Sequence, residues 1–168
     1  MSTPTLYILS GLPASGKTTL AKLLAQRTGA MYMRIDTMEE GLSELCNIKV
    51  EAEGYRLSYR VIRDDLKLGI SAIADSCNTI KITREEWENV ALESGSKFQN
   101  IEISCSHIAE HESRVISRNI EIQNAHSPTW EQVKSRYYEQ WDREIIKIDT
   151  SGKTVAQSFT ELSQKLKL

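Results

Sequence analysis

The sequence predicts an α/β fold built as a three-layer sandwich, with helices on both sides of a parallel sheet. Five short apolar runs alternate with segments whose apolar residues recur at helical spacing. Such runs are typical of strands that are buried on both faces. Their alternation with helices indicates parallel strands joined by helical crossovers. Ligands bind such folds at the carboxyl ends of the strands, so site residues are expected directly after each strand.

The first strand and the first helix are the clearest elements. Thr5–Ser10 is an apolar run of strand length, and Thr18–Arg27 carries Leu20, Leu23 and Leu24 at helical spacing. A strand, a turn and a helix in this order make the first unit of the predicted sheet.

The remaining elements follow from local start and stop signals. Gly69 ends one helix, Thr83 and Glu86 match a capping box, and Pro128 is placed near the first turn of another helix. We expect further strands at 31–35, 70–75, 100–106 and 144–148, and helices at 37–46, 55–68, 83–94, 107–124, from 127 onward and at 155–166.

Between the first strand and the first helix, Gly11–Thr18 reads G-x-x-x-x-G-K-T, a complete phosphate-binding motif. Gly11 and Gly16 allow a tight turn and the close approach of an anion. Amides in the second half of the motif form an anion nest, and the helix start adds its positive dipole end. Lys17 is expected between the β- and γ-phosphates, and the Thr18 hydroxyl on Mg²⁺.

The motif therefore predicts a nucleotide site. The predicted binding residues are Gly11, Leu12, Pro13, Ala14, Ser15, Gly16, Lys17, Thr18 and Thr19. No Asn-Lys-x-Asp motif for reading guanine is present, which favours ATP over GTP, with Mg²⁺ as its metal.

Length and charge limit the alternatives. A chain of 168 residues with 40% hydrophobic content suggests one domain over 1–168. A net charge of −2 gives no electrostatic footprint for long nucleic acid or an anionic membrane. No apolar stretch is long enough to span a bilayer, so a cytoplasmic location is expected.

Neither the histidines nor the cysteines have the spacing of a metal site. They are His107, His111 and His126, and Cys46, Cys77 and Cys105. We expect the histidines on a surface helix and the cysteines as reduced, buried thiols.

Two aspartates follow predicted strands. Asp36 comes after the second strand, where it is either a helix N-cap or a base that accepts the proton of a substrate hydroxyl. Asp75 ends the strand at 70–75. By itself it would be a turn residue, but with the phosphate motif upstream we expect it to reach Mg²⁺ directly or through water.

A polar segment at about 107–126 carries Arg114 and Arg118, four residues apart and therefore on one helix face. One interpretation is a solvated face that pairs with Glu112 and Glu121. The other is a mobile lid whose guanidinium groups clamp phosphate oxygens and whose closure excludes water.

Three segments together resemble the P-loop kinase-like family of P-loop NTPases. They are residues 11–19, Arg-Ile-Asp-Thr at 34–37 and Ala-Asp-Ser-Cys-Asn at 74–78. The family is related to chloramphenicol phosphotransferase, zeta toxins, gluconate kinase and polynucleotide kinases, and the resemblance covers nearly the whole chain. It implies a five-stranded core of order 2-3-1-4-5 with a helical lid, ATP and Mg²⁺, Asp36 as the base, and Arg114 and Arg118 as the lid arginines.

One position departs from the relatives. Polynucleotide kinases and zeta toxins carry an arginine three residues after the aspartate, where this chain has Glu39. The departure weakens the case for a nucleic-acid or nucleotide-sugar acceptor. Asn78, Arg34 and Tyr55 are candidates to line the acceptor site, with a turn, surface pairing and core packing as their respective alternatives.

The sequence thus predicts an ATP-dependent phosphotransferase that acts on a hydroxyl of a small polar molecule. The alternatives are a polynucleotide or nucleoside kinase, and a regulatory ATP-binding module that switches conformation without phosphorylating an acceptor. The sequence leaves the acceptor and the oligomeric state open.

Overall fold

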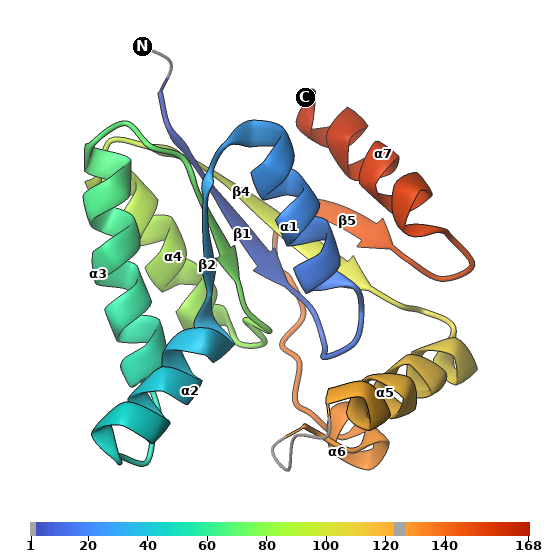
Figure 1. The fold of residues 1–168 in the computed structure, drawn as a ribbon. Helices are drawn as coiled ribbons and strands as arrows, with labels where there is room; N and C mark the ends of the chain where they lie inside the picture. Colours follow the sequence, from blue (N-terminus) through green and yellow to red (C-terminus); the bar gives the residue numbers. More distant parts are fainter. Residues whose placement is uncertain (1–2, 123–126) are drawn as a thin grey trace.

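The computed structural model describes residues 3–122 and 127–168, and its centre is a five-stranded sheet. All neighbouring strands are parallel and follow the order β2-β3-β1-β4-β5. The strands are β1 (Thr5–Ser10), β2 (Met31–Arg34), β3 (Ala72–Asp75), β4 (Lys97–Ser104) and β5 (Ile146–Asp149). The predicted sheet and its strand order are confirmed (Figure 1).

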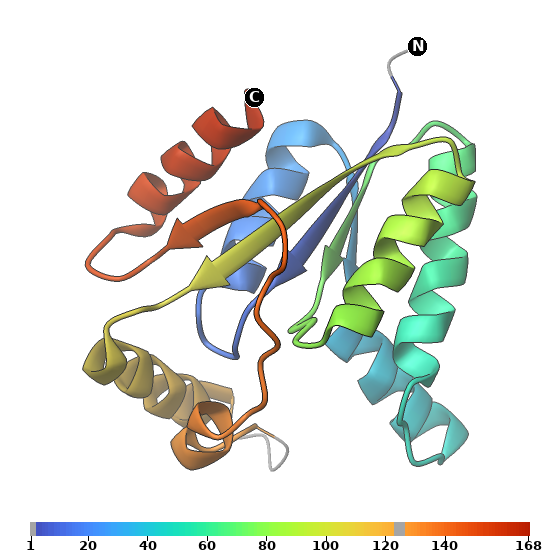
Figure 2. The same cartoon turned by 180° about the vertical axis from the view of Figure 1, so that it is seen from behind.

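Helices cover both faces of this sheet, which confirms the three-layer prediction. The helices are α1 (Lys17–Thr28), α2 (Ile35–Cys46), α3 (Glu53–Lys67), α4 (Lys81–Glu93), α5 (Ile108–Ile122), α6 (Trp130–Lys134) and α7 (Val155–Leu166). Helices α1 and α7 lie on one face, and α3 and α4 on the other (Figures 1 and 2). Helices α2, α5 and α6 lie towards the carboxyl ends of the strands, where ligands bind in this architecture.

Strand β1 supplies side chains to two separate apolar cores. Leu6 and Ile8 pack with Trp87 on the side of α3 and α4, whereas Leu9 packs with Leu20 on the side of α1 and α7. A slip of one residue would exchange the two sets of side chains, so burial on both faces fixes the register of β1. The loop that follows β1 is thereby held at the middle of the sheet edge.

Helix α4 begins earlier than predicted. It starts at Lys81, and Thr83 is not its N-cap. Instead the Thr83 hydroxyl lies 2.7 Å from Asn78 Oδ1 and 2.9 Å from the Ile80 carbonyl. The predicted capping box is wrong because this threonine bonds to the preceding loop.

Helix α6 begins later than the expected start at Ser127-Pro128. It starts at Trp130, and Thr129 forms a capping box with Gln132. The expected lid at 107–126 overlaps α5, and residues 123–126, which include His126, lie outside the described residues. The extent of the lid and the single domain over 1–168 remain predictions.

Within 3–122 and 127–168, no helix has both the length and the apolarity needed to cross a bilayer. The cysteines are free thiols that differ in exposure: Cys105 is buried, Cys77 is half-buried and Cys46 is exposed. The expectation of a buried thiol is wrong for Cys46, because it lies in the exposed last turn of α2.

Candidate active site

The loop after β1 has the backbone conformation of an anion cradle. Gly11 and Gly16 have φ angles of 138° and 101°, and Ala14 has a φ angle of 61°. A Cβ atom at Gly11 would lie 2.1 Å from the Ile103 carbonyl oxygen, so only glycine fits there. The loop therefore packs directly against β4.

The polar groups of this loop are buried and short of partners. Lys17 is 6% exposed, and its ammonium donates to the Leu12 carbonyl at 2.8 Å. Ser15 Oγ is buried and has no hydrogen-bond partner among the described residues. Gly16 caps α1 without a side-chain hydrogen bond, which leaves first-turn amides for an anion. These groups fit a bound phosphate chain, which would supply the missing partners.

Thr18 and Asp75, predicted as the metal residues, are in contact. The Thr18 hydroxyl donates to Asp75 Oδ2 at 2.8 Å, and the Tyr32 hydroxyl donates to the same oxygen at 2.8 Å. Burial, and then the charge of Asp75, raise the pKa of Tyr32 far above its ordinary value, so the phenol remains a donor. Hydroxyl and carboxylate oxygens are donors that suit Mg²⁺, so this pair fits the expected metal.

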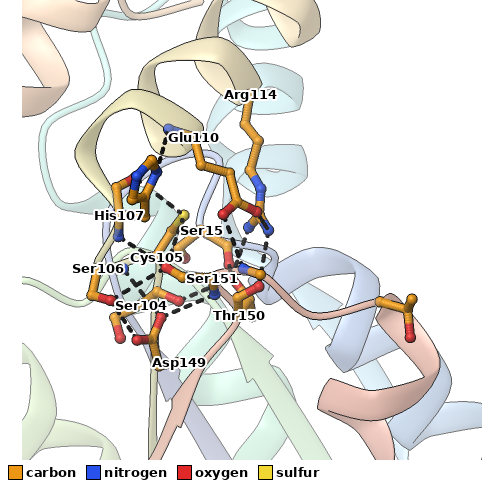
Figure 3. A network of polar contacts seen from close by, with 12 residues as sticks. Ser15, Ser104, Cys105, Ser106, His107, Glu110, Arg114, Asp149, Thr150 and Ser151 are labelled. Carbon is orange, nitrogen blue, oxygen red and sulfur yellow. Dashed lines mark hydrogen bonds and ion pairs between the residues drawn. The ribbon is translucent and has the colours of Figure 1, made fainter.

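Helix α5 is bonded to the phosphate loop both directly and through Thr150. His111 Nε2 lies 2.8 Å from the Pro13 carbonyl oxygen. Arg114 donates to Thr150 Oγ1 at 2.7 Å and to the Thr150 carbonyl at 3.0 Å (Figure 3). Thr150 Oγ1 in turn donates to the Ser15 carbonyl at 2.9 Å. The helix expected as a lid therefore lies against the loop.

The predicted surface position is wrong for His111, which is 6% exposed. Its ring packs edge-on against Trp130, with 5.4 Å between the ring centroids. His107, by contrast, is exposed, and its Nδ1 accepts from the amide of Glu110 at 3.2 Å. A contact with the phosphate loop explains why one histidine of the pair is buried.

The two lid arginines have different surroundings. Arg114 pairs with Glu110 at 2.5 Å as well as with Thr150, so the alternative pairing with Glu112 is not formed. Arg118 is half-buried and makes no hydrogen bond or ion pair with residues 3–120 and 127–168, and the alternative pairing with Glu121 concerns a side chain outside the described part. The structure therefore brings Arg114, but not Arg118, to a residue that touches the phosphate loop.

Asp149, at the end of β5, holds the loop that carries Thr150 (Figure 3). Its carboxylate accepts from the Ser106 hydroxyl at 2.5 Å and from the amides of Ser106 and Ser151 at 3.1 and 3.0 Å. Burial alone would raise the pKa of Asp149, but these hydrogen bonds lower it far below its ordinary value. The ionised carboxylate thus ties the segment after β4, at Ser106, to the loop after β5, at Ser151. Thr150 in that loop is the residue that bonds to Ser15.

Asp36 lies inside the first turn of α2, because the helix begins at Ile35 with Arg34 as its N-cap. The N-cap interpretation of Asp36 is therefore wrong. Its Oδ2 accepts from Arg34 Nη2 at 3.2 Å, and its side chain is 46% exposed. Arg34 on β2 pairs in register with Asp75 on β3. Asp36 lies two residues beyond Arg34 and therefore at the same edge of the sheet as Asp75.

Glu39 adds a second carboxylate on α2. Burial, and then the nearby charge of Asp36, raise the pKa of Glu39, while Arg136 lowers it. Arg136 belongs to the segment after α6, so this segment approaches α2. A Cβ atom at Gly54 would lie 2.2 Å from Glu39 Cγ, so glycine at the start of α3 makes room for the glutamate.

Asn78 occupies the turn between β3 and α4 with a φ angle of 48°. Its amide N–H donates to the Tyr55 hydroxyl at 3.3 Å, and its Oδ1 accepts from Thr83. Burial is the main reason that the pKa of Tyr55 rises to about 12. Asn78 is 1% exposed, and its Nδ2 has no partner among the described residues. The predicted acceptor residues Tyr55 and Asn78 are thus in contact, with one buried donor left over.

Residues 136–143, termed here the return segment, hold this turn from the other side. Arg84 on α4 is 2% exposed and lies 4.1 Å from the ring centroid of Trp141 and 4.9 Å from that of Tyr138. It donates to the carbonyls of Asn78 and Thr79, at 2.9 and 3.2 Å respectively. The amide of Glu139 donates to the second of these carbonyls at 2.8 Å. The turn is therefore fixed by residues distant in sequence.

A cavity of about 750 Å³ lies between α3 and α4. Tyr55, Tyr59 and Thr83 are among its lining residues, but Asp36 and Lys17 are not. The cavity is thus separate from the carboxylate and the ammonium of the predicted chemistry.

Sequence reasoning missed five residues that hold this site together. They are Tyr32, Arg84, His111, Tyr138 and Thr150. Two of them left a usable signal. Tyr32 lies two residues before Arg34 and therefore on the same face of the strand, and Thr150 directly follows the last strand, where site residues are expected. The other three act across contacts that no local pattern encodes.

Several solved structures share this fold. A candidate kinase from Chloroflexus aurantiacus has a TM-score of 0.77 at 21% identity, covering 99% of this chain and 98% of that chain. The APS kinase of Mycobacterium tuberculosis, in complex with AMPPNP and APS, has a TM-score of 0.75 at 15% identity, covering 100% of both chains. A gluconokinase from Sinorhizobium meliloti has a TM-score of 0.65 at 12% identity, covering 99% and 98%. At these identities the likeness concerns the fold alone.

Comparison with curated proteins gave no match. A family model described as AAA domain matches residues 6–140, a range that contains the phosphate loop, Asp36, Asp75 and α5. The match covers most of the chain and includes each predicted element of the nucleotide site. The chain therefore belongs to this AAA domain family, and its fold is that of the P-loop kinase-like proteins.

Proposed function

We propose that this protein is an ATP-dependent phosphotransferase that moves the γ-phosphate to a hydroxyl of a small polar molecule. One observation carries the proposal. A phosphate cradle with a buried ammonium, Lys17, lies beside a bonded pair, Thr18 and Asp75, and a second carboxylate, Asp36, follows the neighbouring strand. A nucleotide-binding module alone requires the cradle and the metal pair; a carboxylate at the place where an acceptor would approach suits transfer.

Each residue has a separate task in this reaction. Lys17 and the loop amides bind the β- and γ-phosphates, and Thr18 and Asp75 hold Mg²⁺, which when bound neutralises charge on the phosphate oxygens. Asp36 orients the acceptor hydroxyl and accepts its proton. A bond forms between the acceptor oxygen and the γ-phosphorus as the bond to the bridging oxygen breaks, leaving ADP and a phosphate ester.

The remaining predicted residues position the reactants. Arg114 or Arg118 on α5 would clamp phosphate oxygens and help to exclude water. Arg34, Tyr55 and Asn78 would line the acceptor side. The buried, unpartnered Nδ2 of Asn78 supports this assignment, because a buried donor without an acceptor is costly and an acceptor oxygen would satisfy it.

A small acceptor is favoured over a polynucleotide. The chain has a net charge of −2, and Glu39 places a carboxylate one helical turn from Asp36. Both features disfavour binding of the negatively charged sugar–phosphate backbone of a nucleic acid. The APS kinase and the gluconokinase with the same fold are named for small acceptors, which fits the proposal.

The proposal is tested by a thermal-shift screen with a non-hydrolysable ATP analogue and Mg²⁺. Sugars, sugar acids, amino alcohols, nucleosides and an oligonucleotide with a free 5′-hydroxyl are added one at a time, because a ligand that binds the native state raises the melting temperature. Each hit is then assayed for transfer of labelled phosphate from ATP.

Lys17→Ala should lose the nucleotide-dependent shift and reduce transfer about a hundred- to a thousandfold. Lys22→Ala, on an exposed face of the same helix, is the matched control. Transfer to the oligonucleotide alone would replace the proposal with a polynucleotide kinase. Slow ATP hydrolysis with no acceptor in the panel would favour the regulatory module.

A further inference from the structure

Asp75 uses one carboxylate oxygen for two hydroxyl donors. Oδ2 accepts from Thr18 and from Tyr32, each at 2.8 Å, whereas no hydrogen bond to Oδ1 is formed within the described part of the chain. The side chain is 2% exposed. A buried carboxylate with both donors on one oxygen has its orientation fixed and its second oxygen available.

The Thr18 bond belongs to the loop motif, but the Tyr32 bond does not. The Thr18 hydroxyl gives its proton to Asp75 and keeps its lone pairs for a cation, so this bond is compatible with a bound metal. Tyr32 comes from β2, outside the three motif segments, and its ring packs in the core beside α1. Its hydroxyl reaches Asp75 diagonally, from the strand next to β3.

The neighbouring strand supplies a comparison within the same sheet. Tyr7 on β1 and Tyr32 on β2 are both register partners of Ile73, and both pack in the core beside α1. The Tyr7 hydroxyl has no hydrogen bond among residues 3–122 and 127–168. The fold thus accommodates a tyrosine at this rung without using its hydroxyl, so the Tyr32 bond is not required for packing a phenol there.

We propose that Tyr32 is a positioning residue for Asp75. Its hydroxyl and that of Thr18 occupy Oδ2, and the carboxylate consequently presents Oδ1 towards the Mg²⁺ of a bound Mg·ATP. Tyr32 itself touches neither metal nor nucleotide. The inference rests on the proposed function only in requiring that the loop binds Mg·ATP.

The inference predicts a specific defect in Tyr32→Phe. Without the phenolic proton, Asp75 is held by Thr18 alone, and the carboxylate is free to rotate. The Mg²⁺ concentration for half-maximal tightening of nucleotide binding should rise about tenfold, as is common when a residue that orients a metal ligand is removed. Affinity for the nucleotide in EDTA should stay at the wild-type value, because within the described residues the Tyr32 hydroxyl bonds to Asp75 and not to the phosphate loop.

The experiment is a titration of Mg²⁺ against the affinity for a fluorescent, non-hydrolysable ATP analogue, with a parallel series in EDTA. Tyr7→Phe is the matched control and should behave as wild type, while Asp75→Asn marks complete loss of the Mg²⁺ effect. Unfolding without ligand is followed for every variant. If Tyr32→Phe does not fold, Tyr32→Met removes the hydroxyl with a flexible apolar side chain that resembles its two neighbours.

The outcomes separate this inference from the proposed function. A Mg²⁺ midpoint for Tyr32→Phe that equals wild type, or an equal rise in Tyr7→Phe, overturns the role of Tyr32 while Mg·ATP binding stands. A loss of affinity that is the same in EDTA and in Mg²⁺ shows a structural role only, and also overturns it. Absence of nucleotide binding by the folded wild-type protein overturns both.

Discussion

The nucleotide side and the acceptor side of the site are built in different ways. The nucleotide side is a short loop clamped between strands, with Gly11 against β4 and Thr18 bonded to Asp75. The acceptor side is a turn around Asn78 that depends on the return segment, more than fifty residues further along the chain. The groups that would bind phosphate are therefore contiguous in sequence, although Asp75, His111 and Thr150 hold them from elsewhere in the chain. The groups of the acceptor side come from separate segments.

The electrostatics of the two sides differ as well. On the nucleotide side, the ammonium of Lys17 is buried beside a carbonyl only, which suits a phosphate chain. On the acceptor side, Asp36 and Glu39 lie on one helix and arginines approach both of them. The phosphate cradle itself presents backbone amides and the Lys17 ammonium, with the Asp75 carboxylate beside it in the metal pair, so the cradle selects an anion by charge. The acceptor side, with carboxylates and arginines together, selects by shape and hydrogen bonding, so the acceptor is the harder ligand to identify.

Asp36→Asn is expected to give the largest difference between the two sides, with a loss of phosphate transfer and no loss of nucleotide binding. Transfer to the identified acceptor should fall about a hundred- to ten-thousandfold, because the amide cannot accept the hydroxyl proton. Affinity for the ATP analogue should remain near wild type. Labelled-phosphate transfer and nucleotide binding are measured on the same preparation, with Glu40→Gln, an exposed neighbour on α2, as control. Unchanged turnover would remove the base assignment.

Arg84→Leu is expected to break the acceptor side alone. The substitution removes both donors to the turn carbonyls and the cation over Trp141, so the free energy of unfolding should fall by about 2–4 kcal/mol. Arg60→Leu, at an exposed arginine on α3 with no hydrogen bond or ion pair among the described residues, should cost less than about 1 kcal/mol. Urea unfolding compares the two variants. Equal losses, or a parallel loss of nucleotide affinity, would show that the two sides are not built separately.

Glu39→Gln should give the smallest effect, and one that depends on pH. Because burial and Asp36 raise the pKa of Glu39 in the folded state, the wild-type protein loses stability as pH rises above the ordinary value of 4.5. The variant should therefore be more stable at neutral pH, by less than about 1 kcal/mol, and equal to wild type near pH 4. Melting curves at both pH values decide it, with Glu40→Gln as control. A gain that persists at low pH would point to packing instead.

The sequence pattern was sufficient for the parallel sheet and the phosphate loop, because their determinants are contiguous, whereas the strand order came from the resemblance to P-loop kinase-like proteins. Thr18 and Asp75 meet because β1 and β3 are neighbours whose carboxyl ends lie at one edge, so their contact follows from that order. Thr83 misled the prediction of a helix start, because its hydroxyl bonds to Asn78 and not to its own helix.

The parts that escaped prediction depend on distant contacts. Arg84 looks like an ordinary charge on a helix, and only the return segment makes its burial favourable. His111 likewise reads as a surface residue until α5 packs on the phosphate loop. Tyr32 has the alternation of any strand residue, and its partner is identified only once β2 is placed beside β3.

The three tryptophans lie in three different parts of the molecule. Trp87 is fully buried in the core, Trp130 packs on His111, and Trp141 stacks on Arg84. Their intrinsic fluorescence therefore comes from three environments that respond to different events. Variants that keep one indole at a time would let a spectrometer follow docking of α5 through Trp130 and arrival of an acceptor through Trp141, with the variant that keeps only Trp87 as the unchanging reference.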